Sequence, residues 1–480
     1  MSDTIFIERD RMNRIVPLIL AVALFMEHMD STVISTALPA IAMDLGVSPI
    51  TLKLALTSYM VSLAVFIPIS GWMADKFGAK NIFRLAIGVF VIGSIMCAIS
   101  SSVFSFVVSR FLQGMGGAMM TPIGRLVLLR TTDRKDLVSA MSLLTIPALV
   151  GPLTGPPIGG FITTYFTWHW IFIINVPIGI IGIWLSSVHL PEIPARGAPP
   201  LDRIGFVLTA VAAAGLVFGL SVVSLPALPP AIGIGTTLLG LLCGGLYILH
   251  SRRHPNPILK LEIFRNTAFR AATTSGSLFR IATGAVPFLM PLMLQLSFGM
   301  TPFQSGLTTF AGAAGALTVK FVAKRAFAAI GFRTALMSAS VAGAAMTAVN
   351  ALFDANTPPL IITFFLFASG LARSLFFTGA NALSYSDIGD DEASQATSIS
   401  SVMQQVSLAL GVAFAALVLE TSSYISGTHL QLADFHLAFL IVSAISLCSI
   451  IPILSLPRHA GASVSGHRIR TADQAEAPGE

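Results

Sequence analysis

Two carboxylates lie within an apolar run that is long enough to span a bilayer. Glu27 and Asp30 are three positions apart in the run of residues 15–38, a spacing that places both on one face of a helix. Ionising a carboxylate at the centre of a membrane is costly, so an acid at this depth indicates a function. An acid that is neutral in apolar surroundings and ionises when water or a cation arrives can carry protons. We predict that Asp30 and Glu27 do so, without deciding which is the main carrier; hydrogen bonding across a helix bundle is the alternative.

His28 follows Glu27 directly. Because neighbouring residues on a helix do not face each other, we expect the ring of His28 to point to a different face from the carboxylate of Glu27. It is a candidate proton relay, although a single histidine in a span is more often a hydrogen-bonding residue of the bundle.

Arg110 brings a positive charge into another apolar run. An arginine inside a membrane is expensive unless it faces an acid, a carbonyl or water. Gln113 shares its helical face, and the glycines that follow let another backbone approach closely, namely Gly114, Gly116 and Gly117. A structural arginine hydrogen-bonded to carbonyls is the alternative to a functional one.

Two more arginines, Arg280 and Arg373, fall in apolar runs of the second half, which has no acid at comparable depth. Three partners carry equal weight: Asp30 or Glu27 across a cavity, an anionic part of a substrate, or carbonyls at a helix break. We count both arginines as candidate substrate-binding residues. The rest of that set is Glu27, Gln113, Met26, Asn381 and Gln404, although amides and methionines inside a bundle are more often packing residues.

The composition is that of a protein that crosses a membrane many times. Charged residues make up 10% of the chain, against about 25% in soluble domains, and the mean hydropathy is +0.83. A spanning helix needs about 20 apolar residues. Runs of this kind predict an all-helical membrane protein with fourteen spans, near residues 15–38, 51–72, 81–101, 104–129, 137–162, 169–189, 203–224, 228–250, 269–294, 304–327, 334–353, 357–383, 394–419 and 435–457.

The basic residues predict the orientation of these spans. Cytoplasmic loops are enriched in Lys and Arg, and a cytoplasmic N-terminus puts all but four of the 28 Lys and Arg residues on that side, the four being Lys53, Arg110, Arg280 and Arg373. An even number of spans makes the C-terminus cytoplasmic too. The net charge of +6 is then a topogenic signal that attracts lipid headgroups, and nucleic acid is not expected as a partner.

Other chemistry is not indicated. The chain has no glycine-rich loop ending in Gly-Lys-Ser/Thr for ATP, and no paired histidines or cysteine cluster for a metal. Its three cysteines fall within predicted spans, so we expect no extracytoplasmic disulfide framework. The first apolar run lacks a cleavage pattern and is expected to remain as an anchor. We expect no cofactor, with protons as the coupling ion.

The loop after the second run, residues 71–80, contains an acid in a tight glycine-flanked turn. Its candidate gate residues are Gly71, Asp75, Gly78 and Lys80. Such an acid can face the positive N-terminal end of a neighbouring helix in one conformation and release it in another. An ordinary polar turn is the alternative.

The fifth run combines glycines spaced by four with prolines. The glycines form a flat stripe for close helix contact, and the prolines remove backbone donors and bend the helix. The residues concerned are Gly151, Pro152, Gly155, Pro156, Gly159 and Gly160.

These motifs resemble those of the major facilitator superfamily. Residues 71–80 resemble its signature loop except at Ala79, where the family usually has a basic residue; residues 110–117 resemble its proton-linked motif, and residues 151–160 its antiporter motif. Residues 30–39 and 168–179 resemble the drug:proton antiporter-2 family, whose members have fourteen spans. The likeness is dense over the first 180 residues and looser in the second half.

The resemblance implies that Asp75 is a conformational gate and that Arg110 pairs with an acid of the first span. Asp30 falls on the aspartate of that span in the family. Glu27 and His28 stand where the family more often has uncharged residues, which suggests a second protonatable site or a preference for a cationic substrate.

We therefore expect a major facilitator fold. Two six-helix bundles would occupy residues 1–190 and 269–457, two additional spans and a cytoplasmic loop residues 191–268, and a disordered cytoplasmic tail residues 458–480. The expected activity is proton-coupled export of a lipophilic, cationic or other small compound by alternating access, in a bacterial cytoplasmic membrane.

Beyond the substrate and membrane lipids, the resemblance allows a periplasmic adaptor protein as a partner, and we expect a monomer. A proton symporter for a small polar solute and a lipid transporter or flippase are the alternatives. An enzyme is not expected, because no clustered nucleophile, base or metal site is visible at either membrane interface.

Overall fold

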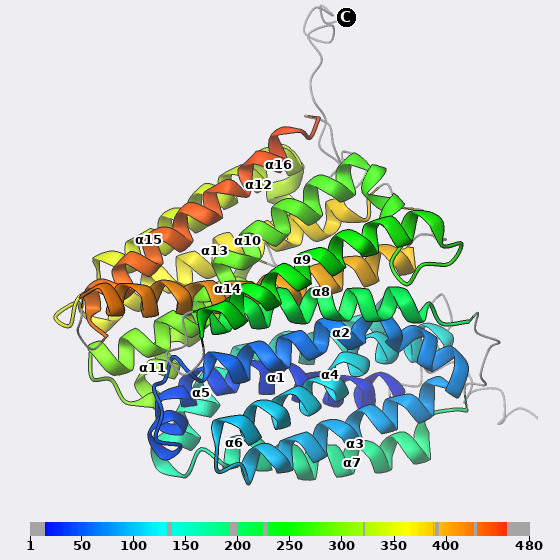
Figure 1. The fold of residues 1–480 in the computed structure, drawn as a ribbon, viewed down its shortest axis with the longest axis horizontal. Coiled ribbons are helices and arrows are strands. Elements are labelled where there is room, and N and C mark those ends of the chain that lie inside the picture. The colour runs from blue at the N-terminus through cyan, green and yellow to red at the C-terminus, as the bar shows by residue number, and fades with distance from the viewer. Residues whose placement is uncertain are drawn as a thin grey trace, which may run out of the picture. The chain divides into compact units, whose positions relative to one another are not determined.

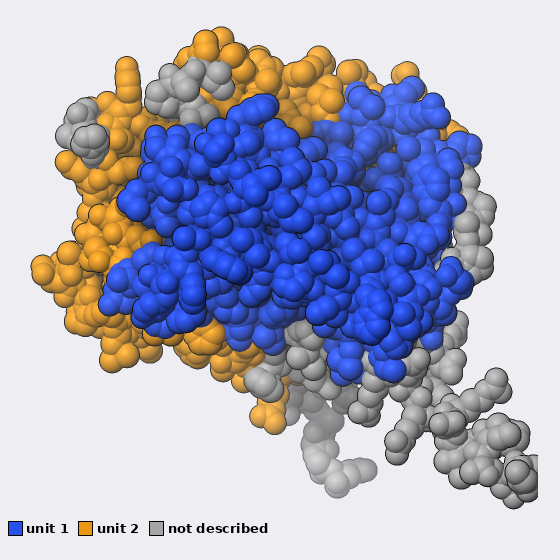
Figure 2. All heavy atoms as spheres, turned by 90° about the horizontal axis from the view of Figure 1, so that it is seen from below, with its two compact units in different colours: residues 1–210, 301–306 blue, residues 211–300, 307–480 orange. Residues whose placement is uncertain are grey.

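The computed structural model describes residues 15–131, 137–192, 200–223, 229–319, 322–386, 388, 393–426 and 430–457. All regular elements within these ranges are helical (Figure 1). They divide into two compact units, unit 1 with residues 1–210 and 301–306, and unit 2 with residues 211–300 and 307–480 (Figure 2). The predicted disordered tail, residues 458–480, lies outside the described residues.

Unit 1 is built from long apolar helices. They are α1 (Ile15–Asp44), α2 (Lys53–Phe77), α3 (Ala79–Ala98), α4 (Val103–Thr131) and α5 (Leu137–Tyr165), followed by the single turn α6 (Trp170–Ile173) and by α7 (Asn175–His189). α1 packs mainly on α5, while α4 packs on both α2 and α3. A buried apolar cluster that includes Leu24, Phe83, Phe90 and Met120 fills the space among α1, α3 and α4. Polar residues of α1 and α4 therefore lie inside the helix bundle.

Unit 2 contains most of α8 (Arg203–Val222). It continues with α9 (Pro230–Arg253), α10 (Thr267–Leu292), α11 (Pro302–Thr318), α12 (Ala323–Val349), α13 (Pro359–Ser384), α14 (Ala393–Ser426), α15 (Leu432–Cys448) and the short α16 (Ile450–Leu454). α10 packs on α13, α14 and α15, and α12 packs on α13 and α15. After Pro287 and Pro291, which lack backbone donors, α10 passes into a π-helical turn, Met293–Ser297. α10 is thus central to the packing of unit 2.

Eleven helices among the described residues are long and apolar enough to cross a membrane. The chain is therefore a multi-pass membrane protein. α4, α5 and α11 are not among these eleven. They occupy the predicted spans near residues 104–129, 137–162 and 304–327.

One predicted boundary is wrong. Instead of continuing to residue 327, α11 ends at Thr318, and α12 already begins at Ala323. Gly331 interrupts α12 with a φ of 70° and a ψ of 165°, so residues 323–330 form a short helix before the long one. Phe327 and Phe332 are buried in one apolar cluster around this break. Hydropathy alone therefore extended the span into a loop.

Candidate functional site

Asp30 lies at the centre of a buried polar network in unit 1. Its Oδ2 accepts a hydrogen bond from Arg110 Nη1 at 2.7 Å, and its Oδ1 accepts from Gln113 Nε2 at 2.9 Å and from Asn175 Nδ2 at 2.8 Å. Both amides also donate to Ser94 Oγ. Asp30, Gln113 and Asn175 are fully buried and Arg110 is 1% exposed. A buried ion pair is tolerated only when its other lone pairs are also satisfied, and the two amides do this for Asp30.

Glycines bring α4 against its neighbours at the level of this network. A Cβ on Gly114 would lie 2.6 Å from the carbonyl oxygen of Tyr59 on α2, and a Cβ on Gly116 would lie 2.6 Å from that of Ala86 on α3. These distances are shorter than any normal contact, so both positions require glycine. The glycines that follow Arg110 were expected to let another backbone approach closely. The backbones of α2 and α3 both do so, on two sides of α4.

Glu27 lies in a second polar cluster beside the first. Its Oε1 accepts a hydrogen bond from Tyr59 Oη at 3.5 Å, and its Oε2 accepts one from Thr121 Oγ1 at 3.3 Å. His28 Nδ1 also lies against Oε2. Glu27 is 6% exposed, whereas the side chain of His28 is 32% exposed. The expectation that His28 points away from Glu27 is wrong, because a buried carboxylate gains more from a nearby donor than from adjacent apolar groups.

Tyr59 joins the two clusters. Its hydroxyl contacts Glu27, and its ring lies beneath the guanidinium of Arg110, with 4.3 Å from Cζ to the ring centroid. This distance is typical of a cation–π interaction. Tyr59 is 2% exposed. The positive charge of Arg110 and the carboxylate of Glu27 therefore contact the same buried side chain.

Another ion pair lies at the end of α2, because the predicted loop of residues 71–80 is helical except at Gly78. Asp75 Oδ1 lies 2.7 Å from Nη2 of Arg130, which is in the last turn of α4. Asp75 was expected to face the N-terminus of a neighbouring helix. It pairs with an arginine side chain instead. Lys80 instead pairs with Glu192 at 3.0 Å.

Gly71, which lies within α2, and Gly78, which follows α2, have different surroundings. Gly78 is the only residue between α2 and α3 and has a φ of 87°, a conformation that residues with a Cβ rarely adopt. A Cβ on Gly71 would meet no atom within 4 Å among the described residues. Packing therefore explains Gly78 as a turn residue and does not explain Gly71.

The glycine stripe of α5 packs on the part of α1 that carries the two acids. A Cβ on Gly151 would lie 3.0 Å from the backbone nitrogen of Met29, and one on Gly155 would lie 3.0 Å from Cβ of Thr32. One on Gly159 would lie 2.7 Å from Oγ1 of Thr36, and that hydroxyl donates to the carbonyl of Pro156 at 3.4 Å. Small residues thus allow α5 to support α1 along the segment on either side of Asp30.

Gly160 has a different neighbour from the rest of the stripe. Its Cβ would lie 2.9 Å from Cα of Phe303, at the start of α11. Pro152, in contrast, is partly exposed. The glycine–proline stretch therefore contacts α1 and the first residues of α11, which belong to unit 1, through its glycines.

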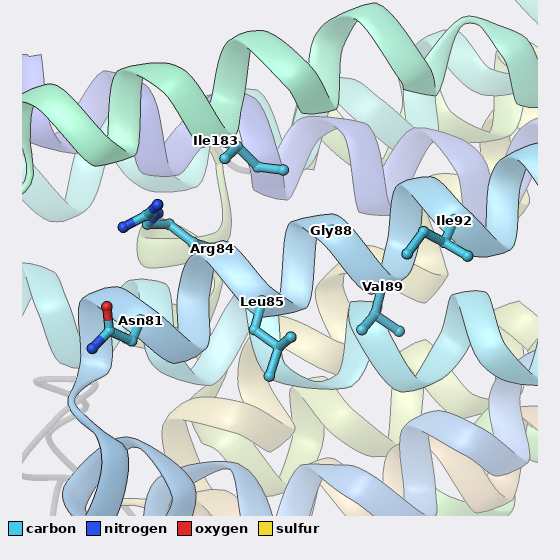
Figure 3. A pocket seen from close by; sticks show the side chains of 7 residues that line it. All are labelled: Asn81, Arg84, Leu85, Gly88, Val89, Ile92 and Ile183. Atoms are coloured by element: carbon cyan, nitrogen blue, oxygen red, sulfur yellow. The ribbon is translucent and has the colours of Figure 1, made fainter.

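A shallow cleft between α3 and α7 contains none of the predicted site residues (Figure 3). Its volume is about 440 Å³, and the lining residues are Asn81, Arg84, Leu85, Gly88, Val89, Ile92 and Ile183. Leu85 and Ile92 are each about half exposed. An apolar hollow on a spanning helix is suited to lipid tails, so we do not include it in the site.

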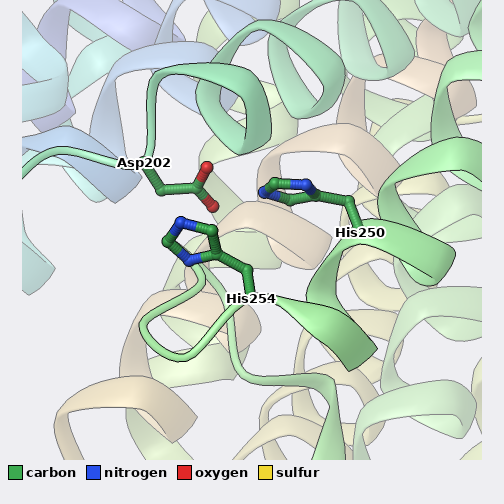
Figure 4. Close-up of side chains that lie close together, drawn as sticks. All are labelled: Asp202, His250 and His254. Atoms are coloured by element: carbon green, nitrogen blue, oxygen red, sulfur yellow. The ribbon is translucent and has the colours of Figure 1, made fainter.

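Two histidines mark the end of α9. The rings of His250 and His254 stack with centroids 5.0 Å apart, and Figure 4 shows both at this helix end. Asp202, also drawn there, caps α8, because its Oδ1 accepts the backbone N–H of Gly205 at 2.8 Å. Histidine near a helix C-terminus is favoured by the partial negative charge at that end. This explains the position of His250 in the last turn of α9.

The candidate residues of unit 2 lie on three helices. Arg280 on α10 is 8% exposed. On α13, Arg373 is partly buried and Asn381 is exposed, while Gln404 on α14 is partly buried. In unit 1, Met26 is 1% exposed and packs in the apolar cluster. Met26 is therefore a core residue in this conformation, and its contact with substrate stays a prediction.

Comparison with known protein families agrees with this architecture. The model described as Major Facilitator Superfamily matches residues 20–251 and 272–471. The chain belongs to the major facilitator superfamily. Within it, the chain is 36% identical over 405 residues to the "Putative multidrug resistance protein MdtD" of Escherichia fergusonii, covering 84% of this chain and 85% of the relative. The protein of the same name from Escherichia coli (strain K12 / DH10B) matches with the same identity and coverage.

Solved structures of transporters share the fold. The peptide transporter POT in complex with sulfate matches with a TM-score of 0.70 and 13% identity, covering 93% of this chain and 95% of that one. A D-xylose-proton symporter matches with a TM-score of 0.66 and 14% identity, covering 93% and 98%. At these identities the likeness concerns the fold alone.

Within this major facilitator fold, the structure brings together Asp30, Arg110 and Gln113, with Glu27 beside them. Gln113 is thus part of the charged network, although it was predicted to bind substrate. Sequence reasoning missed the remaining members of the two clusters and the gate partners, which are Tyr59, Ser94, Thr121, Arg130, Asn175 and Glu192. Of these, only Asn175 carried a usable signal, since an amide within an apolar run must find partners.

Proposed function

We propose that this chain is a proton-coupled multidrug efflux transporter that exports lipophilic small molecules by alternating access. The observation that carries the proposal is the fully buried pair of Asp30 and Arg110, in contact at 2.7 Å. Buried ionisable pairs inside a membrane mark proton and ion pathways. The relatives named as multidrug resistance proteins, which align over 84% of the chain, support the substrate class. As a transporter, the chain is not an enzyme.

The proposed cycle uses the two protonation states of the acids. Ionised Asp30 is stabilised by Arg110 and two amides. A proton that enters from outside neutralises the carboxylate, weakens its attraction to Arg110 and displaces the substrate. The neutral acid permits reorientation; inside, the proton leaves, Asp30 ionises again and substrate binds. Coupling requires only that the substrate bind differently to the two states.

Glu27 is the second acid of this scheme. Its contact with the partly exposed His28 gives protons a route to a buried carboxylate, and its contact with Tyr59 connects it to Arg110. The pair of Asp75 and Arg130 would act as the gate, closed in the conformation described and broken in the opposite one. The glycine contacts of α5 with α1 support antiport, because they keep the acid-bearing helix tightly packed.

The proposed membrane arrangement has fourteen spans with both termini in the cytoplasm. Two six-helix bundles, residues 1–190 and 269–457, flank two additional spans and a loop in residues 191–268. The Escherichia relatives support a bacterial cytoplasmic membrane as the location. We propose a monomer that needs no cofactor besides protons, and a periplasmic adaptor as its optional partner.

The test uses purified protein in liposomes that contain a pH-sensitive dye, with an imposed proton gradient and added ethidium. We expect ethidium to trigger proton movement in the wild type, and the double variant Asp30→Asn with Glu27→Gln to fall to the rate of empty liposomes. Asp354→Asn, at an exposed turn of unit 2, is the matched carboxamide control and should keep the wild-type rate. Undiminished exchange in the folded double variant would refute the mechanism.

A further inference from the structure

Arg280 is a buried charge in unit 2 that the proposed proton cycle does not use. It lies roughly midway along α10, is 8% exposed, and its guanidinium lies over the ring of Phe377 with 4.7 Å from Cζ to the centroid. A Cβ on Gly276 would lie 3.3 Å from Nη1, so glycine leaves room for the guanidinium one turn earlier. Within the described part of the chain, its guanidinium has no hydrogen-bond or ion-pair partner.

Two acids on described helices that pack against α10, Glu420 and Asp434, are not placed to neutralise Arg280. Gly411 of α14 marks the level of Arg280, because its Cβ would lie 3.1 Å from the carbonyl carbon of Ile281. Glu420 is nine residues further along α14, which is roughly 14 Å at 1.5 Å per residue. Asp434 is used in the first turn of α15, where it caps the helix.

A second arginine lies on the helix that faces Arg280. Arg373 precedes Phe377 by four residues on α13 and so shares its helical face. It is partly buried, and no described residue forms a hydrogen bond or ion pair with it. An unpaired arginine inside a membrane is expensive, and one cation–π contact recovers only part of that cost. Two such arginines, one over Phe377 and the other one helical turn away from it, therefore favour an anionic ligand.

Aromatic packing holds the Arg280 guanidinium in a fixed orientation. Phe279 and Phe376 are fully buried and stack with centroids 4.1 Å apart. Phe377 meets both edge-on, at 5.5 Å and 5.7 Å. The ring beneath the guanidinium is thus fixed by two others. A planar guanidinium that is already oriented can bind a carboxylate, sulfonate or phosphate through two parallel hydrogen bonds.

We propose that Arg280, together with Arg373, forms a subsite for the anionic group of amphiphilic organic substrates. The inference rests on the proposed efflux function and deepens it. It adds negatively charged substrates, which the acids of unit 1 would not bind. Substrates would include aromatic or aliphatic compounds with a sulfonate, carboxylate or phosphate.

The test compares two ligands of opposite permanent charge on one ring system: naphthalene-2-sulfonate and (2-naphthylmethyl)trimethylammonium. Neither carries protons across liposomes by itself. Binding to the purified full-length protein is measured by calorimetry. We expect Arg280→Gln to raise the Kd of the sulfonate by roughly tenfold or more, the loss of a charged hydrogen bond, and to leave the Kd of the ammonium compound unchanged. Arg280→Lys should fall between, because lysine lacks the planar fork.

Arg270→Gln is the matched control, since it removes the same charge from the exposed start of α10 and should change neither Kd. The subsite is refuted if the wild type does not bind the sulfonate, if folded Arg280→Gln binds it as tightly as the wild type, or if both ligands weaken equally. If Arg280→Gln does not fold, the comparison is made with Arg280→Lys and Arg373→Gln. Ethidium-triggered proton movement in the same variants tests the efflux function separately, because it does not involve the anion.

Discussion

Replacing Arg110 with methionine should lower the free energy of unfolding by about 3–5 kcal/mol, the usual effect of leaving one member of a buried ion pair without its partner. Asp30 is fully buried and Arg110 is 1% exposed, so water cannot take over the role of the guanidinium. The change also removes the cation that lies over Tyr59. The measurement is denaturant-induced unfolding in mixed micelles.

The double variant Asp30→Leu with Arg110→Met separates the loss of pairing from the loss of packing. Because it leaves no charge uncompensated, it should be more stable than Arg110→Met alone. Arg270→Met, at an exposed position, should stay within about 0.5 kcal/mol of the wild type. A double variant as unstable as the sum of both single changes would contradict the buried pair.

Gly155→Leu should abolish exchange, even in protein that reaches the membrane. A Cβ at this position already lies 3.0 Å from Cβ of Thr32 and 3.2 Å from the carbonyl oxygen of Met29, so the larger side chain must push α1 away from α5. Overpacking of this kind costs about 1–3 kcal/mol or more. Because α1 carries both acids, its displacement also separates Asp30 from Arg110. Ethidium-triggered proton movement and unfolding are measured together.

Gly235→Leu is the control for this substitution. Gly235 lies on α9, where a Cβ meets no atom within 4 Å, so the same added volume should leave exchange unchanged. Exchange at the wild-type rate in Gly155→Leu would mean that close packing of α1 on α5 is not required.

The sequence predicted the Asp30–Arg110 pairing because charge inside a membrane is costly and must be compensated, and the family resemblance narrowed the choice of partner. The same argument does not identify neutral partners. Tyr59, Thr121 and Asn175 reach the acids from three other helices. Their side chains are common in packed membrane helices, so their participation depends on helix rotation, which no local pattern specifies.

The errors of the sequence reading have physical causes as well. His28 contacts Glu27 because side-chain torsions can bring neighbouring residues together, although their Cβ atoms point apart. The tenth span was extended because Phe327 is buried beside Phe332, in the short helix that begins α12, so its hydrophobicity reports packing and not lipid. In each case, tertiary contacts decided what the sequence pattern left open.

Two of the ion pairs of unit 1, Asp75–Arg130 and Asp30–Arg110, respond differently to dissolved salt. The side chain of Asp75 is 38% exposed and that of Arg130 15%, whereas those of Asp30 and Arg110 are 0% and 1% exposed. Electrostatic screening acts over about 8 Å at physiological ionic strength and about 3 Å at 1 M salt, but it reaches only charges in contact with water. Salt therefore weakens the exposed pair and leaves the buried one intact. In the proposed cycle, ionic strength would therefore shift the equilibrium between the two conformations through the gate pair and leave the pair that carries the proton unaffected.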